Sequence, residues 1–274
     1  MCEWSSVSSS GFYDWQNRKS CVSFAQFDML IRSEIRSIFF GSRDTYGHRN
    51  IREELIKQGL QTSYLQVIRI MSEEGLKAMP FVKRSNPYGK QTLESTIAPN
   101  RLKRQFDVKK PDRYWAGDIT YIWTKNGWMY LAIVVDLFSK KVVGWALSQY
   151  PDTSLIIQAL DNAMKVRSPR RWRIMFHSDQ GCQYGSKRFR DRLNDYGILQ
   201  SMSRRGNCWD NAPVESLFGT LKQETGLNKV FANNSNELEV ILFDWIECWY
   251  NSIRNHSTLG YISPQEFEQN NQAA

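Results

Sequence analysis

Three strand-like segments follow one another without an intervening helix, and this order most constrains the fold. Tyr114 to Trp123 is rich in aromatic and β-branched residues, and Trp128 to Val135 and Lys141 to Ser148 have the same character. The sequence Lys125-Asn126-Gly127 between the first two has the composition of a turn. The pattern predicts an antiparallel meander of three strands.

Helical and extended patterns alternate after the meander. They predict a helix over Ser154 to Val166, a strand over Arg173 to His177, a helix over Ser186 to Tyr196, a strand over Leu199 to Ser203, and a helix capped by Asp210 or Asn211. A longer helix is expected from Asn236 to Tyr250. Later strands that join across helical connections give a mixed sheet. The predicted fold class is therefore α/β, an RNase H-like five-stranded mixed sheet flanked by helices.

A small helical region precedes the sheet. Apolar residues at helical spacing predict helices from Phe24 to Ile38 and from His48 to Gln58, and a third that Thr62 or Ser63 caps. Glycines follow each helix, and basic residues are exposed. The region fits a helix-turn-helix. From the pattern alone, an ordinary helical hairpin with a solvated basic face is the favoured alternative.

The segment between the helical region and the strands is basic and broken by prolines. Residues 81–113 carry nine basic against three acidic side chains, and Pro87, Pro99 and Pro111 interrupt them. Such a linker is suited to lie along a phosphate backbone. A plain solvated linker explains the same composition equally well.

Composition excludes several classes of protein. The chain has 274 residues and a net charge of +8, which favours an anionic partner such as nucleic acid but also fits a merely basic surface. No apolar run reaches the ~18 residues of a transmembrane helix, and no signal peptide is evident. Five scattered cysteines predict reduced thiols, and three distant histidines disfavour a zinc finger. A catalytic metal would therefore be bound by oxygen.

Three carboxylates occupy positions where a metal site is plausible. Asp118 lies within the first strand, Asp179 follows a short strand, and Glu215 lies in the first turn of a helix. Two magnesium ions on such ligands can support phosphoryl transfer. Singly, each acid is more simply explained by an ion pair, a turn or a helix N-terminus; together they favour catalysis. Asp136 is a fourth acid, which we expect to organise the turn after its strand.

Several longer motifs carry a resemblance to a known family. They are "YGHRNIREEL", "WAGDITYI", "VVDLFSKKVVGW", "HSDQGCQY", "SRRGNCWDNAPVESLFGTLKQE" and "YNSIRNHSTLGYISPQEF", and they span nearly the whole chain. Asp179 and Glu215 are separated by 35 residues. The chain resembles DDE transposases and retroviral integrases, and in particular the OrfB transposases of IS-three-group bacterial insertion sequences. One departure is Asn255, where that family usually has proline.

The resemblance assigns roles to particular residues. It implies that Asp118, Asp179 and Glu215 are catalytic and bind two Mg²⁺ ions, with Mn²⁺ as a plausible substitute. The DNA-binding residues that we expect are Lys222, Arg204, Arg205 and Arg254. Asn211 and His177 are expected to support the site, although a helix cap and a structural histidine are the simpler interpretations.

The resemblance also implies a domain organisation. The expected boundaries are 1–22 for a lead-in, 23–80 for a helix-turn-helix-like DNA-binding region, 81–112 for the basic linker, 113–225 for the retroviral integrase-type catalytic core and 226–274 for a helical extension. The expected partners are double-stranded DNA, as terminal inverted repeats and as target, a second copy of the chain, and OrfA or an OrfA-derived N-terminal fusion. No membrane is expected, and the expected location is the bacterial cytoplasm, at the nucleoid.

The implied activity is transposition. Metal-dependent cleavage would leave a 3′-OH, which then attacks another phosphodiester, with terminal strands joined into a circle before integration. Two alternatives remain at this point: a nuclease of the same fold without strand transfer, and a catalytically silent DNA-binding regulator.

Overall fold

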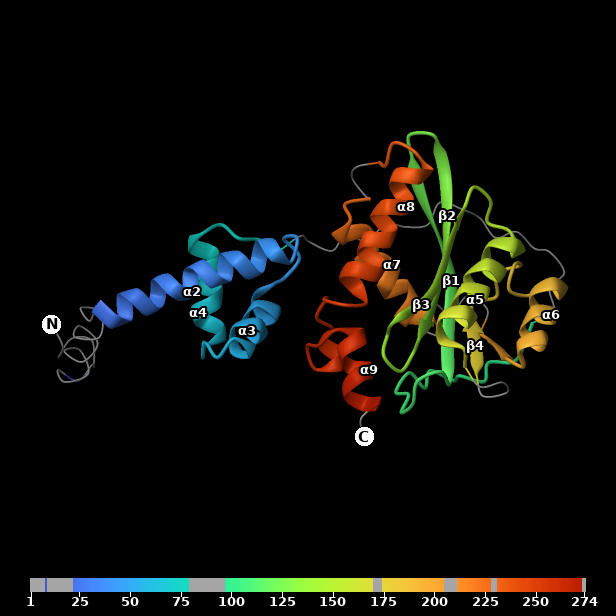
Figure 1. Cartoon of the computed structure of the whole chain (residues 1–274), viewed down its shortest axis with the longest axis horizontal. Helices are drawn as coiled ribbons and strands as arrows, with labels where there is room; N and C mark the ends of the chain where they lie inside the picture. The colour runs from blue at the N-terminus through green and yellow to red at the C-terminus, as the bar shows by residue number, and fades with distance from the viewer. Residues whose placement is uncertain are drawn as a thin grey trace. The chain divides into compact units, whose positions relative to one another are not determined.

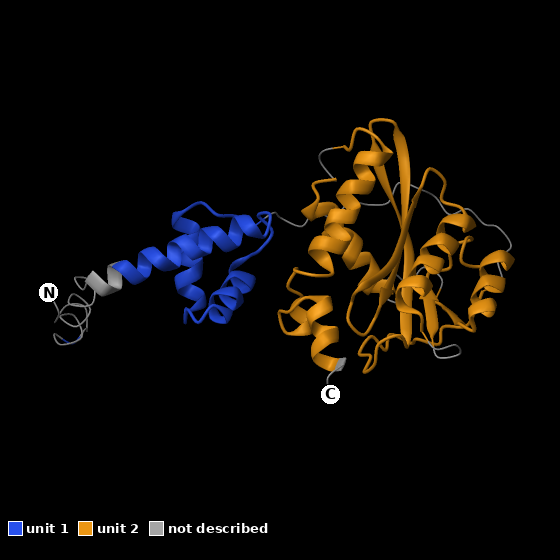
Figure 2. Ribbon diagram, in the orientation of Figure 1, with its two compact units in different colours: residues 1–79 blue, residues 80–274 orange. Residues whose placement is uncertain are grey.

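The computed structural model describes residues 8, 22–78, 97–169, 174–204, 211–227 and 231–272. The chain divides into two compact units, residues 1–79 and residues 80–274 (Figure 2). None of the described helices is both long and apolar enough to cross a membrane.

Unit 1 contains three helices. They are α2 (Val22–Gly41), α3 (His48–Lys57) and α4 (Tyr64–Glu73). In α2 and α3 the predicted apolar faces are buried at Ile35 and Ile51, whereas Leu65 and Ile68 of the third predicted face are exposed. Helix α4 instead buries Val67, Ile70 and Met71, so the face predicted for it is wrong except at Met71. The Ser63 side chain accepts a hydrogen bond from the Gln66 N–H, so Ser63 caps α4, as one of the two candidates predicted.

Unit 2 is built on one five-stranded sheet with the order β3-β2-β1-β4-β5 (Figure 1). Strands β1 (Tyr114–Thr124), β2 (Gly127–Asp136) and β3 (Val142–Ser148) form an antiparallel meander. Strands β4 (Met175–Ser178) and β5 (Leu199–Met202) join it in parallel. The predicted mixed sheet is confirmed. The predicted start of β4 at Arg173 lies outside the described residues.

Helices cover both sides of this sheet. They are α5 (Thr153–Arg167), α6 (Lys187–Tyr196), α7 (Ala212–Glu224), α8 (Ser235–Phe243), the π-helix η3 (Asp244–Tyr250), the 3₁₀ turn η4 (Ser257–Leu259) and α9 (Pro264–Gln272). In Figure 1, α5 and α6 lie on one side of the sheet and α7 and α8 on the other. The helix predicted from Asn236 to Tyr250 is confirmed in its extent, but beyond Phe243 its spacing is π-helical and not α-helical. Apolar periodicity identifies the buried face but not the spacing of the backbone hydrogen bonds.

A glycine sets the distance between the sheet and α5. A Cβ on Gly144 would lie 2.4 Å from the Ala159 carbonyl oxygen and 2.5 Å from the Ala163 nitrogen. Both are backbone atoms of α5, so they cannot move aside as a flexible side chain would. The buried core here includes Trp115 and Phe176. Gly144 therefore lets α5 pack directly on the edge strand β3.

Candidate active site

The strand register brings two of the predicted acids to adjacent positions. In the parallel pair of β1 and β4, Ala116 lies opposite His177. Two residues further along, the same register reaches Asp118 on β1 and Asp179, which directly follows β4. The Asp118 carboxylate accepts a hydrogen bond of 2.7 Å from the Ile119 N–H. Both acids thus lie at the point where β4 ends and β1 continues.

The turn after β4 holds the second aspartate. The Asp179 carboxylate accepts a hydrogen bond of 2.9 Å from the Gly181 N–H. A Cβ at position 181 would lie 2.9 Å from that same oxygen, so any larger residue would crowd the carboxylate. Desolvation raises the pKa of Asp179, and the hydrogen bond from Gly181 opposes this rise.

The third acid lies on α7. Val214, Leu217 and Leu221 form the buried face of this helix, whereas Glu215 is exposed. Helix α7 packs against β1. Burial raises the pKa of Asp118 well above its ordinary value, and the charge of Asp179 and, to a smaller extent, that of Glu215 raise it further. Asp179 and Glu215 therefore both lie close enough to Asp118 for their charges to raise its pKa.

The three carboxylates do not form a closed metal cage. Among the residues that the structure describes, no three histidine, cysteine, aspartate or glutamate side chains are grouped closely enough to hold one metal ion. The site has Asp118 on β1, Asp179 directly after β4, and an exposed Glu215 on α7. Their mutual repulsion is nonetheless what a bound cation would relieve.

A tyrosine near the two aspartates was given no role by the sequence reasoning. Tyr184 is buried, and its ring packs edge-on against Phe189 at a centroid distance of 5.4 Å. Burial, then the charges of Asp118 and Asp179, raise the pKa of its phenol well above the ordinary value. The signal that could have identified it is its position at the end of the "HSDQGCQY" motif.

Lys222 is less exposed than a surface DNA contact would be. It follows Glu215 by seven residues on α7, and its ammonium lies 4.9 Å from the centre of the Tyr121 ring. It is half-buried, and burial lowers its pKa to about 8. A cation above an aromatic ring is stabilised by the ring's electrons. Lys222 thus packs partly onto β1.

The predicted arginines lie in different surroundings. Arg204 is exposed just after β5, and Arg205 lies outside the described residues. Arg254 forms an ion pair of 2.8 Å with Glu224 inside the fold. The same Glu224 carboxylate accepts hydrogen bonds from the indole N–H groups of Trp245 and Trp249, at 3.0 and 3.1 Å. This Glu224 clamp fastens the end of α7 to η3, and sequence reasoning did not predict it.

The two supporting residues are both buried. His177 Nδ1 lies 2.9 Å from the Ser201 hydroxyl on β5. Asn211 stands at the N-cap position of α7, but its side chain makes no capping hydrogen bond, and both of its amide atoms are without a partner in the structure. The predicted capping by Asn211 is therefore wrong. Its side chain is turned into the protein, where it cannot reach the free N–H groups of the first turn.

Asp136 organises a turn, as predicted. Its buried carboxylate accepts hydrogen bonds from the N–H groups of Asp112 and Phe138, at 2.8 and 3.0 Å, and pairs with Arg167 at 2.9 Å. Burial raises its pKa to about 6.

Comparison with known proteins agrees with this architecture. Two family models described as integrase core domains match residues 108–208 and 196–264, and a model described as an HTH-like domain matches residues 26–84. The catalytic core domain of HTLV-2 integrase is a structural neighbour with 19% identity and a TM-score of 0.45, covering 57% of this chain and 96% of that one. The strand order and the family models together define a polynucleotidyl transferase of the integrase-core class.

The relatives specify the family within this class. Transposase InsF for insertion sequence IS3fB from Escherichia coli K12 is 35% identical over 274 residues, covering all of this chain and 94% of that protein. The insertion element IS600 uncharacterized 31 kDa protein from Shigella sonnei is 34% identical over 98% of this chain and 97% of that protein. The chain belongs to the IS3 family of insertion-sequence transposases.

Proposed function

We propose that Asp118, Asp179 and Glu215 are the catalytic carboxylates of this transposase and bind its divalent metal. The observation that carries the proposal is the register of β1 and β4, which reaches Asp118 and Asp179 at the same level of the sheet. The influence of Glu215 on the pKa of Asp118 supports including the third acid.

The donor set fits magnesium. All three side chains offer hard carboxylate oxygens, and Mg²⁺ binds a few carboxylates while keeping several waters. Two such ions, or Mn²⁺ in their place, would activate the attacking oxygen and stabilise the leaving oxygen of an in-line displacement. The residues of the chain hold the ligands in place: the Ile119 and Gly181 N–H groups orient the two aspartates. The reaction is strand cleavage that leaves a 3′-OH, followed by strand transfer.

The same proposal includes contacts with the DNA. The exposure of Arg204 just after β5 and the position of Lys222 on the helix of Glu215 support a role for both in binding phosphates. Arg205 is proposed from its neighbourhood in the sequence alone. Arg254 has an internal partner, and a role on DNA stays a prediction. The proposed substrates are terminal inverted repeats and target duplex; self-association and an OrfA-type partner are further proposals.

The experiment uses a labelled terminal-repeat duplex with magnesium. We expect wild-type protein to nick the duplex at the element's end and to join the labelled 3′-OH to a target duplex. Asp179→Asn should reduce both products to background. The matched control is Asp195→Asn, which removes the same charge from an exposed position on α6. Cleavage by Asp179→Asn would contradict the assignment, and cleavage without joining would indicate a nuclease.

A further inference from the structure

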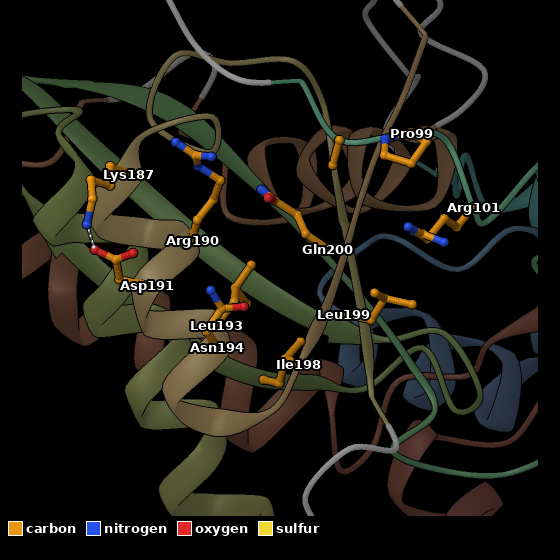
Figure 3. A pocket seen from close by; sticks show the side chains of 11 residues that line it. Pro99, Arg101, Lys187, Arg190, Asp191, Leu193, Asn194, Ile198, Leu199 and Gln200 are labelled. Carbon is orange, nitrogen blue, oxygen red and sulfur yellow. Dashed lines mark hydrogen bonds and ion pairs between the residues drawn. The ribbon is translucent and has the colours of Figure 1, made fainter.

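A basic groove lies on the edge of unit 2 formed by β5 and α6. It has a volume of about 400 Å³, and Figure 3 shows the side chains that line it, from α6, from β5 and from the segment before β1. Ile198 and Leu199 contribute an apolar part, while Arg101, Lys187 and Arg190 contribute positive charge. None of these residues belongs to the carboxylate site.

Specific hydrogen bonds hold part of the basic linker against β5, where it forms one wall of this groove. The Ser201 hydroxyl on β5 accepts from the N–H groups of Arg101 and Leu102, at 2.9 and 3.3 Å. The Ala98 N–H donates to the Met202 sulfur at 3.4 Å. The end of the linker therefore runs along β5, and Arg101 and Arg190 line the same groove from two different segments (Figure 3).

Three of the four basic side chains on α6 form an ion pair or a hydrogen bond with another side chain. Arg192 pairs with Asp161 at 2.7 Å, Lys187 with Asp191 at 2.7 Å, and Arg188 donates to the Ser154 hydroxyl at 3.0 Å. Arg190 differs, because its Nε–H is buried without any hydrogen-bond acceptor. A buried N–H without an acceptor is energetically unfavourable. Arg190 thus has no acceptor for this N–H within the part of the protein that the structure describes, and its side chain lines the groove.

We propose that this groove binds the phosphodiester backbone of duplex DNA, as a second contact apart from the carboxylates. The proposal rests on the DNA substrate named under the proposed function, but not on the metal site. Phosphate oxygens are acceptors for guanidinium groups, and bidentate pairing suits arginine. Asp191, the one acid among the described residues that line the groove, is already paired with Lys187. The unpaired charge is therefore positive and comes from Arg101 and Arg190.

The groove is joined to the candidate active site by a short segment. Residues 179–186 lead from Asp179 directly to α6. Gln200 in the groove donates its amide N–H to the Tyr184 carbonyl oxygen at 2.7 Å. DNA held in the groove would thus contact the element that continues from the catalytic turn.

The test measures how salt affects the binding of a fluorescent duplex that lacks the terminal repeat. Each lost phosphate contact should reduce the slope of log affinity against log salt by about 0.9. We expect this reduction in full-length Arg190→Gln and Arg101→Gln, and a slope close to wild type in Arg190→Lys. Arg188→Gln is the control, since it removes one charge from α6 outside the groove. Circular dichroism melting checks that each variant is folded.

Two results would overturn the proposal. One is a wild-type slope in Arg190→Gln and Arg101→Gln, even if these variants lose binding of a polyglutamate peptide, which would assign the groove to an acidic protein partner. The other is an equal reduction in all three glutamine variants, which would indicate a diffuse charge effect. Failure of the carboxylate proposal would appear separately, as Asp179→Asn protein that still cleaves DNA.

Discussion

Burial controls the protonation of the side chains around the candidate site. Asp118 is held in a less solvated position beside another acid, and its pKa is raised. Lys222 is half-buried above the Tyr121 ring, and its pKa is lowered to about 8. The two shifts have opposite directions because desolvation always disfavours the charged form. A lysine proposed to hold phosphate is therefore close to losing its charge in mildly alkaline solution.

A pH-dependent DNA affinity follows from Lys222. Its charge is lost in free protein as pH rises through about 8, so we expect affinity for duplex DNA to fall between pH 7 and pH 9. Lys222→Arg, which stays charged, should give a flatter curve. Fluorescence anisotropy across that range measures the difference; parallel curves for the two proteins would contradict the prediction.

The same shift has a consequence for folding with a defined sign. The unfolded chain keeps its lysine proton up to a pKa of about 10.5, whereas the folded chain releases it near 8. Between these values the unfolded state binds more protons, so this lysine makes the free energy of unfolding increase with pH. Urea unfolding of wild type and Lys222→Arg should show the increase only in wild type.

The sequence can predict the role of a residue when its partners are near it in the chain, but not when they are far from it. Asp136 could be predicted as a turn organiser, because an acid at the end of an apolar strand accepts nearby N–H groups. The seven-residue spacing could place Lys222 on the helix face of Glu215. It could not show that the lysine lies over Tyr121, a contact between residues 101 positions apart. The Glu224 clamp could not be predicted either, because its partners, Trp245, Trp249 and Arg254, are also distant in the sequence.

At the level of elements, the close approach of β3 and α5 requires a residue without a Cβ, whose side chain is a single hydrogen atom. Gly144 meets this requirement, because a Cβ at that position would clash with the α5 backbone. The strands and helices themselves follow from apolar patterns, and their order was predicted. The π-helical spacing of η3 was not, because the same buried face serves both kinds of helix. A pattern of polar and apolar residues likewise does not predict the distance between two packed elements.

Gly144→Ala should destabilise unit 2 by about 1–3 kcal/mol, as overpacking of a tight interior does. Ala163→Gly should not rescue it, because the closest atoms are backbone atoms of α5. The control is Gly41→Ala in unit 1, where a Cβ would meet nothing within 4 Å. Urea unfolding measures all three. Full rescue by Ala163→Gly would show that the Ala163 methyl group, and not the backbone, opposes the change.

At the scale of the whole molecule, the chain has two units that match different family models. The HTH-like model covers residues 26–84, most of which lie in unit 1, and the integrase core models cover residues 108–264 in unit 2. From the sequence, the helices of unit 1 could equally have formed a plain hairpin, since basic residues on a helix do not identify a ligand. The comparison with the family models supplies what the pattern lacked.

The division into units predicts separable functions. A protein containing residues 97–274 alone should fold, and should bind duplex DNA with little preference for the terminal repeat over a scrambled sequence. The full chain should retain that preference, because the helix-turn-helix-like unit is the one suited to read base edges. Competition binding with both duplexes checks this. An undiminished preference in the shorter protein would place sequence recognition in unit 2.

Through the Glu224 clamp, the C-terminal part of the chain helps to position the helix that carries Glu215, one of the proposed catalytic acids. Helix α7 carries Glu215 near its start, and its other end is fastened to residues 245–254. A genomic copy that stops before Trp245 would still encode all three acids, yet α7, which carries Glu215, would have lost its anchor. Decayed insertion elements with intact acidic motifs but shortened 3′ ends are therefore expected to be inactive.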